Sequence, residues 1–126
     1  MRFWVKNEKL ISIVIPIYNG AKYISNIYTN IMNQTYRPIE LIFVNDGSKD
    51  DSENVLKDIV KMHNCKSEIK IIILSGPNGG IAVARNRGMA ASTGEYVMFV
   101  DQDDWLEKDC VEKLMQVAGL TDADMV

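Results

Sequence analysis

The chain has 126 residues, of which 47% are hydrophobic and 25% are charged. This length and composition are typical of a single globular domain with one hydrophobic core. The net charge of −3 at pH 7 argues against binding of nucleic acid, which usually requires a basic face. Cys65 and Cys110 lie far apart in the sequence, which predicts free thiols. His63 is the single histidine, so a His-rich metal site or a Ser/His/Asp triad is not expected.

No stretch of the sequence is long enough to cross a membrane. The longest apolar run, residues 11–17, is interrupted by Ser12 and Pro16 and is far shorter than a membrane span. The N-terminus also lacks the layout of a signal peptide. We therefore expect a cytoplasmic protein, with membrane association only through regions outside this chain.

Hydrophobic periodicity in the first half of the chain predicts two strand–helix pairs. Near-continuous apolar runs indicate the strands, and an apolar stripe through Ile24, Ile27 and Ile31 indicates the first helix. Ser48 is the expected N-cap of the second helix, which would bury Met62. The expected strands are 11–17 and 39–44, and the expected helices are about 21–34 and 48–62.

The second half of the chain continues the same alternation. Its first strand is near-continuously apolar, as expected when helices cover both faces of a sheet. The loop Asn78-Gly79-Gly80 lacks the spacing of a P-loop or of a dinucleotide-binding motif. The expected strands are 69–74 and 96–100, the expected helices end at about 91 and span 108–118, and the tail at 123–126 has the pattern of a further strand.

Strict alternation of strands and helices with short links is typical of parallel βαβ units. We therefore expect an α/β, Rossmann-like fold with a mainly parallel sheet and helices on both faces. Because the chain stops where another element should begin, we expect residues 1–126 to be one domain that is truncated at the C-terminus. Residues 1–9 are expected to be an N-terminal extension.

The acidic cluster Asp101-Gln102-Asp103-Asp104 is the strongest functional signal in the sequence. It follows the strand pattern at 96–100, so its carboxylates are expected at the end of a buried strand. Carboxylates this close together repel one another, and a cation or a set of hydrogen-bond donors usually compensates them. Ligands of α/β folds bind at this edge of the sheet. The cluster therefore predicts a site for a divalent metal and a phosphate-bearing ligand.

Three segments carry a resemblance to a known family. SIVIPIYNG, IELIFVNDGSKDDS and NGGIAVARNRGMAASTGEYVMFVDQDDWL together resemble the family-2 glycosyltransferases, the large inverting group that uses nucleotide-sugar donors. The resemblance covers the chain from Ile11 onward and implies an A-type glycosyltransferase fold. It also implies transfer of a sugar, expected to come from a UDP-sugar, to an acceptor hydroxyl with inversion. The expected acceptor is a glycan, a polysaccharide or a lipid-linked molecule, in polysaccharide or glycan biosynthesis.

The resemblance also implies roles for individual residues. Pro16 and Tyr18 match a loop that packs around the nucleotide base and ribose. Asp46 matches an acidic residue that accepts a hydrogen bond from the uracil ring, and Arg85 matches an arginine that helps to bind the nucleotide. With Asp101, these residues form the expected nucleotide-sugar site.

Asp101 and Asp103 match the D-x-D signature of the family. In that signature the first carboxylate contacts the ribose or a metal-bound water, and the second coordinates Mn²⁺ or Mg²⁺ on the diphosphate. Such a metal acts as a Lewis acid on the departing nucleoside diphosphate. Asp104 is expected to contact these two residues rather than the metal itself. The resemblance places the general base downstream of this chain, so the chain alone is expected to be the inactive donor-binding half of a glycosyltransferase domain.

Simpler interpretations remain open for several of these residues. In the first, the acidic cluster is a solvated turn in which Asp103 or Asp104 is the N-cap of the next helix. In the second, Asp46 forms an ordinary Asx turn. Arg87 is expected on the solvated face of its helix. Trp105 is expected to pack against the fold rather than to stack on a sugar.

Other functional classes share some of these features. A haloacid-dehalogenase-like phosphatase also carries D-x-D after an apolar strand, but its motif lies near the N-terminus rather than late in the chain. A response-regulator receiver would need acidic partners near the first strand, and residues 16–18 supply none. A catalytically incomplete module that binds a nucleotide-sugar remains an alternative.

Overall fold

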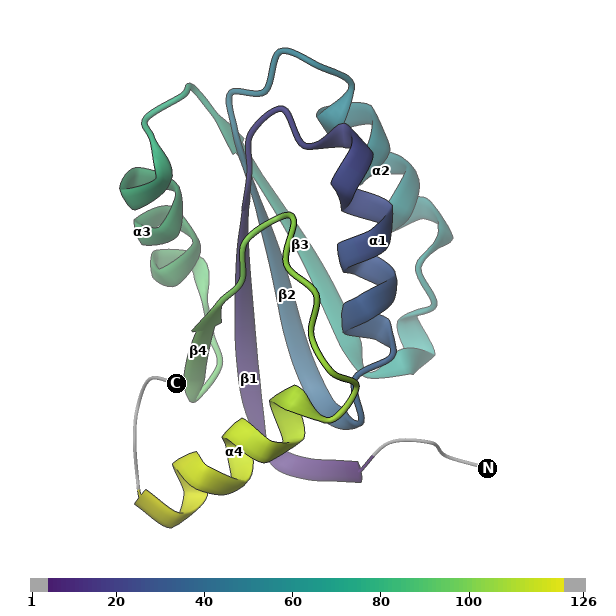
Figure 1. The fold of residues 1–126 in the computed structure, drawn as a ribbon, viewed down its shortest axis with the longest axis vertical. Helices are drawn as coiled ribbons and strands as arrows, with labels where there is room; N and C mark the ends of the chain where they lie inside the picture. The colour runs from purple at the N-terminus through teal and green to yellow at the C-terminus, as the bar shows by residue number, and fades with distance from the viewer. Residues whose placement is uncertain (1–4, 122–126) are drawn as a thin grey trace.

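The structure is a computed structural model and describes residues 5–121. Strands and helices alternate along the chain, as the hydrophobic pattern predicts. Figure 1 shows how they are arranged. In chain order they are β1 (Val5–Ile17), α1 (Ala21–Met32), β2 (Tyr36–Asp46), α2 (Ser52–Met62), a 3₁₀ turn (Cys65–Ser67), β3 (Ile69–Gly76), α3 (Ile81–Ala91), β4 (Tyr96–Phe99) and α4 (Cys110–Thr121).

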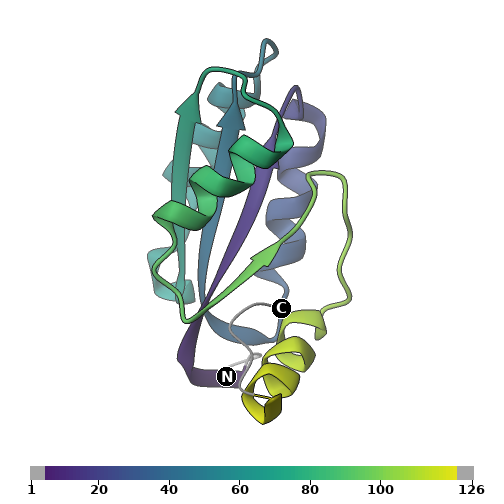
Figure 2. The same ribbon diagram turned by 90° about the vertical axis from the view of Figure 1, so that its left-hand side faces the viewer.

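Within residues 5–121, the strands form one parallel sheet in the order β3-β2-β1-β4. Helices α1 and α2 cover one face of this sheet and α3 covers the other, while α4 lies near the end at which the strands begin (Figures 1 and 2). The expected parallel sheet with helices on both faces is therefore confirmed. Because all strands run in the same direction, the loops that follow them meet at one edge.

The hydrophobic core occupies both faces of the sheet because side chains along a strand alternate between them. Ile13 and Ile15 of β1 belong to the larger cluster, which includes buried side chains of α1 and α2. Val14 belongs to a smaller cluster with Ala84 of α3. Helix α3 lies very close to the sheet, since a Cβ on Gly88 would be 2.2 Å from Val14 Cγ1. Small residues on α3 therefore set its distance from the sheet.

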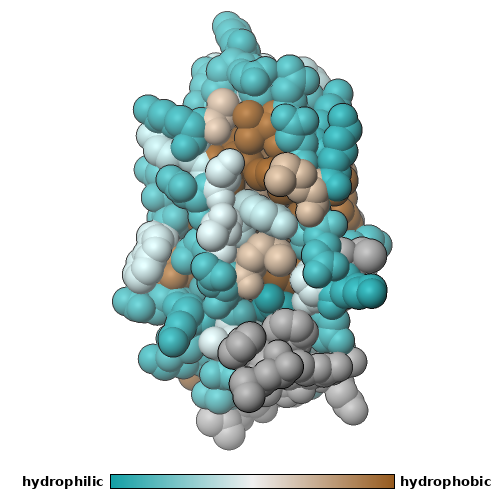
Figure 3. All heavy atoms as spheres, turned by 90° about the vertical axis from the view of Figure 1, so that its right-hand side faces the viewer, coloured by the Kyte–Doolittle hydropathy of each residue, from teal (hydrophilic) through white to brown (hydrophobic). Residues whose placement is uncertain are grey.

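Helices α1 and α2 are amphipathic. The buried stripe of α1 consists of Ile24, Ile27 and Ile31, as the periodicity predicts. The outer surface on this side of the molecule is mostly hydrophilic, with a limited apolar strip (Figure 3). Within residues 5–121, no helix has the length and apolar character that a membrane span requires.

Pro16 lies inside the sheet although proline has no N–H to donate. The carbonyl of Val14 accepts a hydrogen bond from Val100 N, and alternate residues of a parallel strand face the same neighbour. Pro16 therefore faces the β4 side, but beyond Phe99, the last residue of β4 that pairs with β1. The proline breaks no hydrogen bond of the β1–β4 ladder at this position.

Several predicted details differ from the structure. The N-cap of α2 is Asp51 rather than Ser48, because Ser48 Oγ instead accepts a hydrogen bond from Asn19 N. Met62 is 85% exposed rather than buried, because it is the last residue of α2. The further strand expected at 123–126 lies outside the described residues.

The N-terminal boundary also differs from the expectation. Strand β1 begins at Val5, so part of the expected extension at 1–9 belongs to the sheet. Val5 and Lys6 pair with the start of β2, and the register then shifts before pairing resumes at Ile11. The regular β1 ladder nevertheless begins at Ile11, where the sequence pattern predicts its start.

A buried carboxylate ties the α3–β4 connection to the sheet. Glu40 of β2 is 1% exposed. It accepts hydrogen bonds from Ser12 Oγ at 2.8 Å, Thr93 N at 2.8 Å and Thr93 Oγ1 at 2.7 Å. Burial alone would raise the pKa of Glu40, but the hydrogen bonds from Thr93 and Ser12 outweigh it and lower the pKa below its ordinary value. Glu40 is therefore an anion that the fold itself stabilises.

Candidate functional site

A cavity of about 330 Å³ lies at the edge of the sheet where the strands end. Its walls come from the ends of β1 and β2, from the loops after β1, β3 and β4, and from the first turn of α3. Parallel α/β sheets bind their ligands at this edge. The lining residues are Pro16, Ile17, Tyr18, Asp46, Asn78, Gly80, Ile81, Ala84, Asp101, Gln102 and Asp103.

The structure brings most of the predicted site residues together in this cavity. The residues that line it come from the ends of three different strands, or directly after them: Pro16, Tyr18, Asp46, Asp101 and Asp103. A second cavity, of about 560 Å³, contains none of them and lies where β2 and β3 begin. The first cavity is therefore the candidate site.

Asp46 is a buried residue that closes the loop before α3. It is 4% exposed, and its two carboxylate oxygens accept hydrogen bonds from Gly79 N at 2.9 Å and Gly80 N at 3.0 Å. Gly80 has a φ of +93°, a conformation that glycine adopts readily. Ser48 N donates to Asn45 Oδ1, so Asn45, not Asp46, forms the turn after β2. The simpler interpretation, that Asp46 forms a local Asx turn, is therefore wrong.

Arg85 lies beside the cavity rather than in its wall. Its Nη2 is 3.4 Å from Asp101 Oδ1, and its guanidinium carbon is 5.9 Å from the centre of the Phe99 ring. Its Nε is buried and has no hydrogen-bond partner among the described residues. The guanidinium therefore neutralises part of the charge of the acidic cluster and retains a donor.

Arg87 does not line the cavity, but it lies beside the buried carboxylate of Asp46, which the sequence did not predict. Its Nη1 donates to the Pro77 carbonyl at 3.2 Å and lies 4.0 Å from Asp46 Oδ1. A Cβ on Gly76 would be 2.7 Å from the same nitrogen, so glycine there makes room for the arginine. The expectation that Arg87 belongs to a solvated helix face is wrong. No local pattern could have shown it, because its partners lie in other loops.

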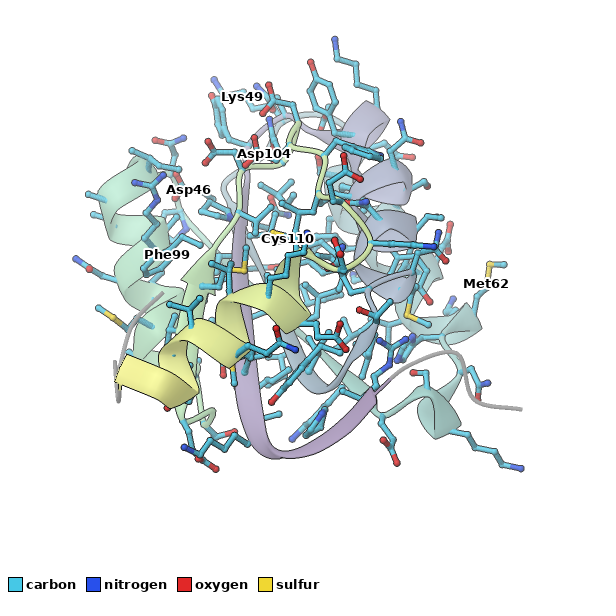
Figure 4. The ribbon with its side chains drawn as sticks, turned by 60° about the horizontal axis from the view of Figure 1, so that its bottom comes forward. Asp46, Lys49, Met62, Phe99, Asp104 and Cys110 are labelled. Carbon is cyan, nitrogen blue, oxygen red and sulfur yellow. The ribbon has the colours of Figure 1, made fainter. Side chains whose placement is uncertain are left out.

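The acidic cluster forms a turn of its own. Asp104 N donates to Asp101 O at 3.1 Å, and Asp104 Oδ2 accepts from Asp101 N at 2.9 Å. The side chain of Asp103 is exposed, and no hydrogen bond or ion pair joins it to another described residue. Asp104 and Asp46 lie at the same end of the molecule (Figure 4). Because α4 begins only at Cys110, neither Asp103 nor Asp104 caps it, so the capping interpretation is wrong.

Trp105 also differs from the expectation. It is 70% exposed and does not pack against the fold as predicted. The next residue is fixed, because Asn30 Oδ1 accepts from Leu106 N at 2.7 Å and Asn30 Nδ2 donates to Leu106 O at 2.8 Å. The backbone after the acidic turn is therefore held in place at Leu106, while the side chain of Trp105 remains largely exposed to solvent.

The family of the chain follows from comparison with known sequences. The model of the family described as "Glycosyl transferase family 2" matches residues 12–126. The chain belongs to this family. The matched range includes every residue that lines the candidate cavity.

Two relatives of this family 2 chain illustrate the similarity. The glycosyltransferase GlyG of Streptococcus pneumoniae is 39% identical over 120 residues, which are 94% of this chain and 38% of the relative. The hyaluronan synthase of Pasteurella multocida is 42% identical over 108 residues, which are 86% of this chain and 11% of the relative. The chain therefore spans well under half the length of these relatives.

Solved structures of glycosyltransferases share the fold. S. aureus TarS in complex with UDP-GlcNAc matches with a TM-score of 0.68 and 29% identity, over 89% of this chain and 31% of that chain. The mannosyltransferase PcManGT from Pyrobaculum calidifontis, in complex with GDP-Man and Mn²⁺, matches with a TM-score of 0.78 and 23% identity, over 86% of this chain and 32% of that chain. The expected A-type glycosyltransferase fold is confirmed.

The residues of this family 2 chain fit a hard divalent cation. Within residues 5–121, no group of three or more His, Cys, Asp and Glu side chains is placed to hold a metal by itself. Mg²⁺ and similar ions often take only one or two protein carboxylates, together with water and phosphate oxygens. The exposed carboxylates of Asp101 and Asp103 supply this set at the cavity wall. Asp103 and Asp101 are therefore the candidate metal ligands.

Proposed function

We propose that this chain binds the donor in a glycosyltransferase that transfers a sugar from a nucleoside diphosphate, with inversion, to an acceptor hydroxyl. The proposed donor is a UDP-sugar, and the proposed pathway makes a polysaccharide or another glycan. The observation that carries the proposal is the single cavity that contains both Asp46 and the acidic turn in a family 2 chain. The general base and the acceptor site are not assigned to residues of this chain.

The end of the cavity near Asp46 is proposed to hold the base and ribose. Pro16 and Tyr18 offer apolar and aromatic surface for the base. Each oxygen of a carboxylate has more than one acceptor position. The bonds from Gly79 N and Gly80 N therefore leave Asp46 able to accept a further hydrogen bond from an N–H of the base.

The end of the cavity near the acidic turn is proposed to hold the diphosphate. Asp103 and Asp101 would hold Mn²⁺ or Mg²⁺, which supplies Lewis-acid stabilisation of the departing diphosphate. Arg85 is placed beside this end, where its guanidinium can face phosphate oxygens. Asp104 holds the backbone of Asp101 and so fixes the direction of both candidate ligands.

Uracil is the proposed base, although related proteins bind different nucleotides. TarS was solved with UDP-GlcNAc and PcManGT with GDP-Man. Both uracil and guanine present a ring N–H that can donate a hydrogen bond to a carboxylate. Selectivity between the two bases therefore has to come from the volume of the cavity and from the ring of Tyr18. A comparison of UDP with GDP binding tests this selectivity.

Isothermal titration with UDP and with GDP, each with and without Mn²⁺, tests the proposal. We expect UDP to bind more tightly than GDP, and we expect Mn²⁺ to strengthen UDP binding. Asp103→Asn should remove most of the metal-dependent gain, because it replaces a charged ligand with a neutral amide. Asp109→Asn is the matched control, since Asp109 pairs with Lys113 on α4, away from the cavity.

Each outcome of the titration has a distinct meaning. Failure of the folded protein to bind either nucleotide would contradict the proposed donor site. Equal affinity for UDP with and without Mn²⁺ would contradict the proposed metal site but would still support the proposed nucleotide site. Tighter binding of GDP would overturn the choice of base.

A further inference from the structure

Gln102, the middle residue of the D-x-D segment, makes two hydrogen bonds to the loop that follows β1. Tyr18 N donates to Gln102 Oε1 at 3.0 Å, and Gln102 Nε2 donates to Tyr18 O at 3.2 Å. The side-chain amide thus pairs with both backbone groups of one residue, as a neighbouring strand would. The β1–β2 ladder ends at Ile17, so Gln102 takes over where the sheet stops.

The position of the Gln102 amide depends on the glycine at residue 20. A Cβ on Gly20 would lie 2.2 Å from Gln102 Oε1 and 2.8 Å from its amide carbon. Gly20 is buried, and its N donates to Ser52 Oγ, so the backbone there is held in place. Any larger residue at position 20 would displace the amide.

The acidic turn is held to the fold on either side, because Val100 N donates to Val14 O of β1 and Leu106 pairs with Asn30 of α1, but these bonds do not reach the Tyr18 loop. The hydrogen bonds between Asp101 and Asp104 hold the turn in shape, but they do not fix its distance from β1. The pair of Arg85 with Asp101 is exposed on both sides, at 42% and 55%, and exposed pairs contribute little. Gln102 therefore supplies the direct hydrogen bonds from the acidic turn to the Tyr18 loop.

We propose that Gln102 is a positioning residue that sets the spacing between the base-binding loop and the metal-binding carboxylates. A nucleoside diphosphate carries its base and its diphosphate on one ribose, which limits the distance between its two ends. Contacts at the two ends add fully only when the protein holds both walls at the matching distance. Gln102 provides that spacing without touching the metal itself. This inference rests on the proposed donor site.

Gln102→Met tests the inference, because methionine keeps the length of the side chain and lacks both hydrogen-bonding groups. The quantity to measure is the ratio of UDP affinity with Mn²⁺ to UDP affinity with EDTA. We expect this ratio to fall by about tenfold, which corresponds to about 1.4 kcal/mol. A residue that only stabilised the fold would lower both affinities together and leave the ratio unchanged. Gln116→Met, on the exposed side of α4, is the matched control and should keep the ratio.

Gly20→Ala provides an independent route to the same defect. It should expel the Gln102 amide and lower the ratio by a similar factor. The double variant should be no worse than either single variant, because both changes remove one shared interaction. Gln102→Asn serves as a second variant at position 102, since its amide is one methylene too short to reach both Tyr18 groups.

The outcomes separate this inference from the proposed function. Wild-type protein that binds no UDP with Mn²⁺ would overturn both. If the wild-type protein binds UDP more tightly with Mn²⁺ than with EDTA, but Gln102→Met and Gln102→Asn show the same affinity ratio as the wild type, only the role of Gln102 is overturned. Fully additive losses in the double variant would also contradict it.

Discussion

Asp46 and Asp103 line the same cavity, but the fold uses them in different ways. Asp46 is 4% exposed, and both of its oxygens accept hydrogen bonds from backbone N–H groups of the loop before α3. Asp103 is exposed and has no hydrogen-bond or ion-pair partner among the described residues. The first carboxylate belongs to the architecture of the site, and the second is available to a ligand.

The two carboxylates differ because buried and exposed charges at this edge of the sheet are stabilised in different ways. Buried charges need partners in the protein, because desolvation is costly. An exposed turn can keep carboxylates close together, because water screens them until a cation binds. Substitutions at the two positions should therefore separate folding from binding.

The largest expected effect on stability is that of Asp46→Ala. The change leaves two backbone N–H groups without their charged acceptor, and we expect it to lower the free energy of unfolding by about 2–4 kcal/mol. Chemical denaturation followed by circular dichroism would measure this. Asp46→Asn keeps one acceptor oxygen and should lose about half as much. If Asp46→Ala were as stable as the wild type, the loop would not depend on this carboxylate.

Glu40 extends the comparison to a carboxylate buried away from the cavity. Glu40→Gln should lower the free energy of unfolding at pH 7 by about 1–3 kcal/mol, because an amide cannot accept all three hydrogen bonds. The hydrogen bonds lower the folded-state pKa of Glu40 below its ordinary value, so the contribution of the carboxylate is complete above the unfolded pKa and is lost as the pH falls through the folded pKa. Wild type and variant should therefore converge in acid. A constant difference between pH 7 and pH 3 would contradict this role.

How far the site could be predicted from the sequence depends on how local each signal is. The acidic cluster directly follows a strand pattern, so the position of Asp101 and Asp103 at the sheet edge follows from adjacent residues. Asp46 was placed correctly at the end of β2, but its bonds to Gly79 and Gly80 depend on how a distant loop returns to the sheet.

The errors of prediction have the same cause. Ser48 has the composition of an N-cap, but its hydroxyl bonds to the β1–α1 loop, and Asp51 takes the cap position. The sequence predicts a solvated Arg87, because its partners, Asp46 and Pro77, come close to it only in the folded chain. The sequence predicts that Trp105 packs against the fold, because tryptophan is highly buried on average, but its side chain is 70% exposed.

Arg85 and Arg87 offer a finer test, since they lie on one helix and face different carboxylates. Arg87→Ala should reduce stability by about 1 kcal/mol, because its hydrogen bond to the Pro77 carbonyl is lost. Arg85→Ala should change stability less, because its ion pair with Asp101 is exposed, but it should weaken UDP binding. Thermal unfolding and titration of both variants would show whether the two effects separate. The same loss of stability in both would contradict the assignment.

The smallest effect on stability is expected for Asp103→Ala. Surface substitutions without partners usually change stability by less than about 0.5 kcal/mol, and the removal of one charge from the cluster relieves repulsion. The same variant should lose most of the metal-dependent UDP binding. A destabilisation comparable to that of Asp46→Ala would show that Asp103 serves the fold instead.

The most direct test of the account is an NMR titration of ¹⁵N-labelled protein with UDP and a small amount of Mn²⁺. We predict that UDP shifts the amide resonances of Gly79 and Gly80, which bond to Asp46. We predict that Mn²⁺ then broadens the resonances of residues 101–104 most strongly, because paramagnetic broadening falls steeply with distance. Broadening centred elsewhere, for example near Lys70 in the second cavity, or no UDP-dependent shift at all, would contradict the placement of base and metal at the two ends of one site.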